Sequence, residues 1–153
     1  PGFIGDISYA QSNRERYEGF CQALADAGKK VDSSLCLTTP LGIDTYREEI
    51  DTFLSSLSRM PDAFVCASDY VACILMQLLE KRGLRVPEDV AVSGFDNNTE
   101  DLLAEHLTTV QVFNEELGAR LALQILYRIK YPNTPHEVTY LGTNVLYRDS
   151  TGD

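Results

Sequence analysis

Short apolar runs and longer amphipathic stretches alternate along the first hundred residues of the chain. The apolar runs, at 3–5, 31–37, 63–67 and 90–92, have the length of buried strands. Apolar residues spaced three or four positions apart predict helices at 13–27, at 43–57 and from Asp69 up to Gly83. This alternation predicts an α/β fold in which a doubly wound parallel sheet carries helices on both faces.

Residues that start and stop helices stand at the ends of these segments. Ser12 with Glu15 forms a capping-box pattern before the first helix, and Gly28 follows its last turn. Ser68 and Asp69 stand at the start of the third helix, and Gly83 stands at its end. We therefore expect the strands before these helices to end close to Asp6 and Ser68.

The pattern changes after Asn98. A short helix is possible at 99–106, an extended passage at 107–112 and a long helix at 115–131, followed by strand candidates at 138–141 and 144–147. No repeat or low-complexity tract interrupts the 153 residues, which are enough for a single core. We therefore treat 1–153 as one domain.

Composition excludes several functions. The net charge of -10, without a basic cluster, argues against nucleic-acid binding by this chain itself. The spacing of the four cysteines predicts free buried thiols, and neither they nor the two histidines form a metal motif, so we expect no metal and no cofactor. No nucleophile elbow, Walker loop or dinucleotide fingerprint is present, so we do not expect an enzyme. No membrane span or signal sequence is visible, and a start at Pro1 without Met indicates a fragment.

Polar side chains gather where the predicted strands end, and ligands bind at this carboxyl edge in open α/β sheets. The candidates at or near the edge are Ser12, Arg16, Ser68, Asp69 and Asp96. Hydroxyls, carboxylates and a forked guanidinium suit a neutral polyol, and Tyr9, Tyr70 or Phe95 are candidates for an apolar wall. Structural roles stay open for each candidate: helix caps for Ser12 and Asp69, an Asx turn for Asp96 and an exposed surface position for Arg16.

A series of short motifs extends over nearly the whole chain. The motifs are Arg16-Tyr17-Glu18-Gly19-Phe20, Pro61-Asp62-Ala63-Phe64 leading to Ala67-Ser68-Asp69, Gly83-Leu84-Arg85-Val86-Pro87-Glu88-Asp89-Val90, Gly94-Phe95-Asp96, Leu107-Thr108-Thr109-Val110, Glu116-Leu117-Gly118 and Arg148-Asp149-Ser150-Thr151. In their order and spacing these motifs resemble the effector-binding region of the lac and galactose repressor family of bacterial transcription regulators.

The resemblance implies a periplasmic binding protein-like fold of two hinged subdomains, of which this chain is the second. It implies that Arg16 and Asp96 hold a sugar or sugar phosphate, with Ser12 nearby, and that Ser68-Asp69 replaces the family's common Asn-Asp. It further implies that 110–141 crosses to the first subdomain, which this chain lacks. The apolar face of the long helix would then be covered by this sheet or by another chain, or it would stay exposed at a cost in free energy.

The function implied is effector binding in a cytoplasmic transcriptional repressor. The implied partners are a small-molecule effector, a second copy that meets the helices after Ser68 and around 99–104, and operator DNA bound by a headpiece outside this chain. Two other hypotheses are a sugar-binding protein of a transport system and, from a different class, a small hydrolase or phosphoacceptor domain using Asp69.

Overall fold

The computed structural model describes residues 1–42, 44–98 and 102–152. Its main sheet contains four parallel strands in the order β2-β1-β3-β4. These strands are β1 (Gly2–Ile4), β2 (Cys36–Leu37), β3 (Ala63–Cys66) and β4 (Ala91–Ser93). The predicted alternation of strands and helices around a parallel sheet is therefore confirmed.

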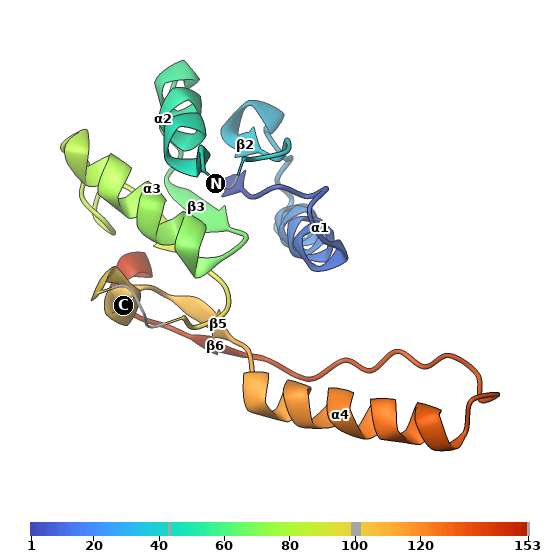
Figure 1. Ribbon diagram of the computed structural model, residues 1–153. Coiled ribbons are helices and arrows are strands. Elements are labelled where there is room, and N and C mark those ends of the chain that lie inside the picture. Colours follow the sequence, from blue (N-terminus) through green and yellow to red (C-terminus); the bar gives the residue numbers. More distant parts are fainter. Residues whose placement is uncertain (43, 99–101, 153) are drawn as a thin grey trace.

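Helices cover both faces of this sheet (Figure 1). On one face α1 (Gln11–Asp26) places Phe20 and Leu24 against Phe3 of β1. On the other face α2 (Tyr46–Ser56) and α3 (Asp69–Lys81) pack against the side that carries Ile4 and Phe64. The side chains of adjacent strand residues therefore enter two separate hydrophobic clusters, as the period of two in a strand requires.

The α3 helix is the most deeply buried helix among the described residues. Eight of its 13 residues are buried, because the helix lies between the sheet and the segment that follows β4. Ser68 caps it by accepting a hydrogen bond from the Val71 amide, at 3.3 Å. Gly83 follows the helix with a φ of 73°, and its amide donates to the Glu80 carbonyl. The predicted start and end of this helix are both confirmed.

The capping box predicted at Ser12 is wrong. The helix begins earlier, after an extended Ala10, and no side chain among the described residues caps it. The amides of Asn13 and Arg14 both donate to the Ala10 carbonyl, which places Ser12 inside the first turn. The sequence contains the capping-box pattern, but α1 begins directly after Ala10, so Ser12 already lies within the helix and cannot cap it.

The second predicted strand is shorter than 31–37. Ser33–Leu35 forms a 3-10 turn, η1, in which the Asp32 carboxylate accepts from the Ser34 amide and hydroxyl, at 3.1 and 2.6 Å. This local bonding withdraws the segment from the sheet, and only Cys36–Leu37 pairs with β1. The second helix is also shorter than 43–57, and position 43 lies outside the described residues.

Beyond β4 the chain forms a second, antiparallel sheet of two strands, β5 (Thr109–Gln111) and β6 (Asn144–Leu146). The 3-10 turns η2 (Leu102–His106) and η3 (Asp149–Thr151) flank it, and 99–101 of the predicted short helix lie outside the described residues. The strand predicted at 138–141 is wrong, because this described segment has no regular secondary structure.

Residues 112–143, which we call the arm, extend away from this body (Figure 1). The arm contains α4 (Asn114–Lys130) and an irregular return segment. Gln124 donates to Glu137 at 2.9 Å, and Arg128 donates to the Thr134 carbonyl at 2.6 Å, so the return segment is bonded to the helix. None of the residues of α4, all of which the structure describes, is buried. The sheet therefore does not cover the apolar face of this helix.

The four cysteines are free, as predicted, although only Cys66 and Cys73 are fully buried. Burial raises the pKa of the Cys66 thiol well above its ordinary value. Across the described ranges no cluster of three His, Cys, Asp or Glu side chains is arranged to hold a metal ion. No helix in the described part of the chain is long and apolar enough to cross a membrane.

Candidate functional site

Arg16 lies at the carboxyl edge of the main sheet, where α1 passes the ends of β3 and β4. Its Nη1 donates to the Ala67 carbonyl at 2.5 Å, and its guanidinium carbon lies 3.7 Å from the centroid of the Phe95 ring. Its Nη2 lies 3.5 Å from Oδ1 of Asp96. A carbonyl, an aromatic face and a carboxylate thus hold the planar guanidinium in one orientation.

Asp96 follows β4 and faces Arg16 at this edge. Its side chain is 42% exposed and that of Arg16 is 20% exposed, so a small molecule can reach both. The Asp96 amide donates to the Val110 carbonyl at 2.9 Å, and Asp96 forms a parallel bridge with Gln111, the last residue of β5. Arg16 and Asp96 are 80 positions apart in the sequence, and the fold brings them together.

Burial shifts the pKa values of both Arg16 and Asp96. Burial raises the pKa of Asp96, Arg16 lowers it again and Asp69 adds to the rise, and the result lies above the ordinary value. Burial lowers the pKa of Arg16, although Asp96 and Asp69 oppose this change. A guanidinium stays charged in proteins despite such a shift. The pair therefore offers an ionised donor fork beside a half-buried carboxyl group.

Asp69 is placed differently from the exposed pair. It is 2% exposed, its Oδ1 accepts from the Thr109 hydroxyl at 2.6 Å, and its Oδ2 accepts from the Asn98 amide at 2.8 Å. The Ser68 hydroxyl accepts from the Val71 amide as the α3 cap. Both residues therefore build the rim of the site, and their polar atoms already have partners within the protein.

Ser12 lies exposed on the first turn of α1, one helical turn before Arg16. Asp6, after β1, is buried and accepts from Ser8, Tyr9 and Leu41. Burial raises the pKa of Asp6, but the hydrogen bonds from Ser8, Leu41 and Tyr9 outweigh it, so the pKa lies below its ordinary value. Within the described part of the chain, Ser12 has no such hydrogen-bond network on the rim, whereas Asp6 shapes the loop after β1.

Three contacts at the candidate site were not predicted from the sequence. Phe95 supports Arg16 with its ring face, Thr109 holds Asp69, and Arg148 donates from Nη2 to the Asn97 side-chain oxygen at 2.8 Å. Thr109 and Arg148 lie in motifs that carried the resemblance, but a motif does not state which partner a residue bonds. The ring of Phe95 is engaged by Arg16, which leaves Tyr9 and Tyr70 as exposed aromatic side chains near the edge.

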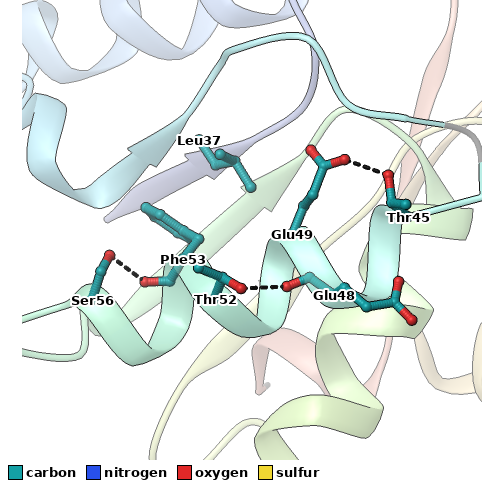
Figure 2. A pocket seen from close by; sticks show the side chains of 7 residues that line it. All are labelled: Leu37, Thr45, Glu48, Glu49, Thr52, Phe53 and Ser56. Carbon is teal, nitrogen blue, oxygen red and sulfur yellow. Dashed lines mark hydrogen bonds between the residues drawn. The ribbon is translucent and has the colours of Figure 1, made fainter.

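A separate hollow of about 490 Å³ lies along α2, beside the end of β2 (Figure 2). Three of its hydroxyls already donate within α2 or its first turn: Thr52 to the Glu48 carbonyl, Ser56 to the Phe53 carbonyl, and Thr45 to Glu49. This hollow lacks the guanidinium and carboxylate pair of the rim. The rim near Arg16 and Asp96 is therefore the better candidate for polar ligand recognition.

Known proteins are similar to this chain in both sequence and fold. Residues 1–151 match the profile of the periplasmic binding protein-like domain. The HTH-type transcriptional regulator DegA of Bacillus subtilis (strain 168) is 35% identical over 117 residues, which are 76% of this chain and 34% of DegA. The HTH-type transcriptional regulator CelR of Thermobifida fusca is 34% identical over 142 residues, which are 89% of this chain and 40% of CelR.

A solved structure agrees with these sequence matches. The complex of the transcriptional regulator CelR with cellobiose superposes with a TM-score of 0.85 at 29% identity, over 97% of this chain and 46% of that chain. The chain spans less than half the length of each of these relatives. With nearly every residue matched to the domain profile and the same fold in a solved regulator, the chain belongs to the periplasmic binding protein-like domain family.

Proposed function

We propose that this chain is the effector-binding part of a bacterial transcriptional repressor and that its effector is a sugar or sugar phosphate. The observation that carries the proposal is the preoriented Arg16 beside Asp96 at the carboxyl edge of the sheet. Sugar hydroxyls both donate and accept hydrogen bonds, and this pair supplies an acceptor next to a forked donor. The cellobiose complex of a related regulator supports a sugar as the ligand class.

The contacts divide the candidate residues into two roles. Arg16 and Asp96 bind the effector directly, with Ser12 as a third, weaker contact from the first turn of α1. Ser68 and Asp69 act mainly by shaping the rim, because their polar atoms are bonded within the protein. A buried Asp69 also argues against a phosphoacceptor role, which needs an accessible carboxylate, and we propose that the chain has no catalytic activity.

The rest of the repressor lies outside this chain in our proposal. A net charge of -10 leaves operator binding to a separate headpiece, because phosphate contacts require basic side chains. The segment 110–141, which contains most of the arm, crosses to a first subdomain that covers α4. Effector occupancy shifts the hinge between the two subdomains. We place the protein in the cytoplasm as a homodimer. The relatives named above are regulators, so they favour this function over that of a transport component.

Titration calorimetry on the intact protein tests the effector site. The sugar panel contains cellobiose, glucose, galactose, ribose and their phosphates. For whichever sugar binds, Asp96→Asn should weaken affinity by at least about tenfold, as expected for a hydrogen bond to a charged group. Arg16→Lys should weaken it as well, because an ammonium has neither the donor fork nor the stacking face.

Asp89→Asn is the matched control. Asp89 precedes β4 on an exposed loop, at the end of the strand opposite to Asp96. Its sugar affinity should equal that of the unchanged protein. An Asp96→Asn protein that binds as tightly as this control would exclude the proposed site. Operator DNA release, measured by fluorescence anisotropy, should follow sugar binding, and release that ignores every sugar in the panel would contradict the function.

A further inference from the structure

The loop after β4 holds two consecutive residues in the left-handed region of backbone space. Asp96 has a φ of 116° and Asn97 a φ of 55°. Neither is glycine, and residues with a side chain adopt such conformations only at a cost in free energy. They persist only where the surroundings fix the backbone. Contacts with the rest of the protein must therefore hold the loop that presents the Asp96 carboxylate in this conformation.

The main-chain amides of this loop are bonded one after another. The Asp96 amide donates to the Val110 carbonyl at 2.9 Å, and the Asn97 amide donates to the Thr109 hydroxyl at 3.3 Å. The Asn98 amide donates to the buried Asp69 carboxylate at 2.8 Å. Two elements, β5 and α3, thus hold the backbone of the loop from one side.

Arg148 holds the same loop through a side chain. Its Nη2 donates to the Asn97 Oδ1 at 2.8 Å, and its Nη1 donates to the carbonyls of Ala104 and Leu107, at 2.9 and 3.0 Å. Arg148 thus joins the site loop to the turn that precedes β5. Both of its Nη atoms are engaged with protein acceptors.

The backbone of Arg148 is itself fixed. Its amide donates to the Thr108 hydroxyl at 2.8 Å, and its carbonyl accepts from that hydroxyl at 3.0 Å. The following Ser150 is 2% exposed and donates to the Val92 carbonyl of β4 at 2.6 Å. The turn that carries Arg148 is therefore anchored to β4, the strand that precedes the Asp96 loop.

We propose that Arg148 is a positioning residue: it holds the Asn97 side chain, which keeps the strained loop in place and sets the Asp96 carboxylate opposite Arg16. It controls ligand affinity through Asn97 and does not contact the ligand. The affinity part of this inference rests on the proposed function, whereas the conformational part does not need a ligand.

Hydrogen–deuterium exchange of the intact, ligand-free protein tests the conformational part. Arg148→Met should exchange about tenfold faster in peptides covering 95–98, while peptides from β1 and β3 should be unchanged. Thr151→Val is the matched control. The Thr151 hydroxyl bonds the Thr108 hydroxyl, which also bonds the Arg148 backbone, but no described contact joins Thr151 to Asn97. Its loop peptides should exchange as in the unchanged protein. Equal exchange at 95–98 in Arg148→Met and Thr151→Val would overturn the proposal.

A double-mutant cycle tests the route through Asn97. Asn97→Gly removes the acceptor of Arg148 and tolerates a φ of 55°. For the sugar bound most tightly in the panel, Arg148→Met should weaken affinity about tenfold, within the measured range for coupled neighbours. In the Asn97→Gly background the same change should have no further effect. Fully additive effects would overturn the proposal.

Two further outcomes remain decisive. If Arg148→Met does not fold, Asn97→Gly alone should accelerate exchange at 95–98, and unchanged exchange there would overturn the proposal. If no sugar binds the unchanged protein, the proposed function fails, and the exchange comparison still decides whether Arg148 positions the loop.

Discussion

At the scale of single residues, Asp96 combines two unfavourable properties. Its backbone is in the left-handed region, and partial burial raises its pKa despite Arg16 nearby. A folded pKa above the unfolded one means that ionisation of this carboxylate opposes folding. Both properties suit a residue whose carboxylate serves a ligand better than it serves stability.

Asp96→Asn should therefore stabilise the unliganded protein at pH 7. The amide keeps the shape of the side chain and tolerates a positive φ, but it carries no charge to desolvate. Below the ordinary pKa of 3.8 the wild-type carboxyl is neutral in both states, so the gain should shrink steadily as the pH falls toward 4. Urea unfolding between pH 4 and pH 7.5 measures this difference.

Asp89→Asn should show the opposite sign in the same series. Hydrogen bonds from Arg85 lower the pKa of Asp89, so its ionised form supports the fold. The Asp89→Asn protein should be less stable at pH 7 and still at pH 4, because the stabilisation is lost only below the ordinary pKa of 3.8, as the pH falls through the lowered pKa of the folded state. Extending the urea series below pH 4 measures this closure. Two Asp→Asn proteins that change stability in the same direction at pH 7 would contradict this assignment of pKa shifts.

At the scale of secondary structure, two serines at helix starts differ in what they bond. The Ser68 hydroxyl caps α3, whereas Ser12 lies within the first turn of α1 without a cap bond. Ser68→Ala should lower the free energy of unfolding by about 1 kcal/mol, the usual effect of losing an N-cap. Ser12→Ala should change it by less than about 0.5 kcal/mol, as at other surface positions.

Urea unfolding of the two alanine variants at one pH tests this pair. Equal losses would mean that Ser12 caps α1 in solution. If Ser12→Ala leaves stability unchanged but weakens sugar binding in calorimetry, the result would support its proposed place at the ligand.

Much of the main sheet could be predicted, because its strands are apolar runs bounded by helix stops such as Gly28 and Gly83. The failures occurred where local bonding competed with periodicity, as at Asp32, which turns its segment into a 3-10 helix. For the candidate site, the position of Asp96 after a strand of a parallel sheet indicated the carboxyl edge, whereas the choice of Arg16 and Asp96 as ligand contacts depended on the family resemblance. The bond from Arg148 to Asn97 was not predictable, since it depends on the pairing of strands only three residues long.

At the scale of the whole molecule, the arm departs from the rule that apolar helix faces are covered. Leu126 is 63% exposed and Ile129 is 73% exposed, and α4 has no buried residue in the structure described. A contiguous apolar surface of this kind favours association. In our proposal, the first subdomain covers it in the intact protein.

Leu126→Glu combined with Ile129→Lys should reduce self-association of the 153-residue chain without lowering its unfolding midpoint, because neither side chain contributes to its core. Sedimentation velocity and thermal unfolding measure the two effects. The same changes in the intact protein should lower the midpoint, since they place charges in the proposed interface. A lower midpoint in the short chain as well would show that α4 packs on the body, contrary to the structure.

The arm leaves and re-enters the body through paired residues, because Gln111 lies opposite Asn144 in the β5 and β6 register. In topological terms the 32 residues from 112 to 143 are therefore an insertion in a hairpin. A two-residue Asn-Gly turn has the geometry to join Gln111 directly to Asn144. The remaining chain would keep the Arg16 and Asp96 rim and the Arg148 anchor, because the described contacts of these residues do not involve the arm.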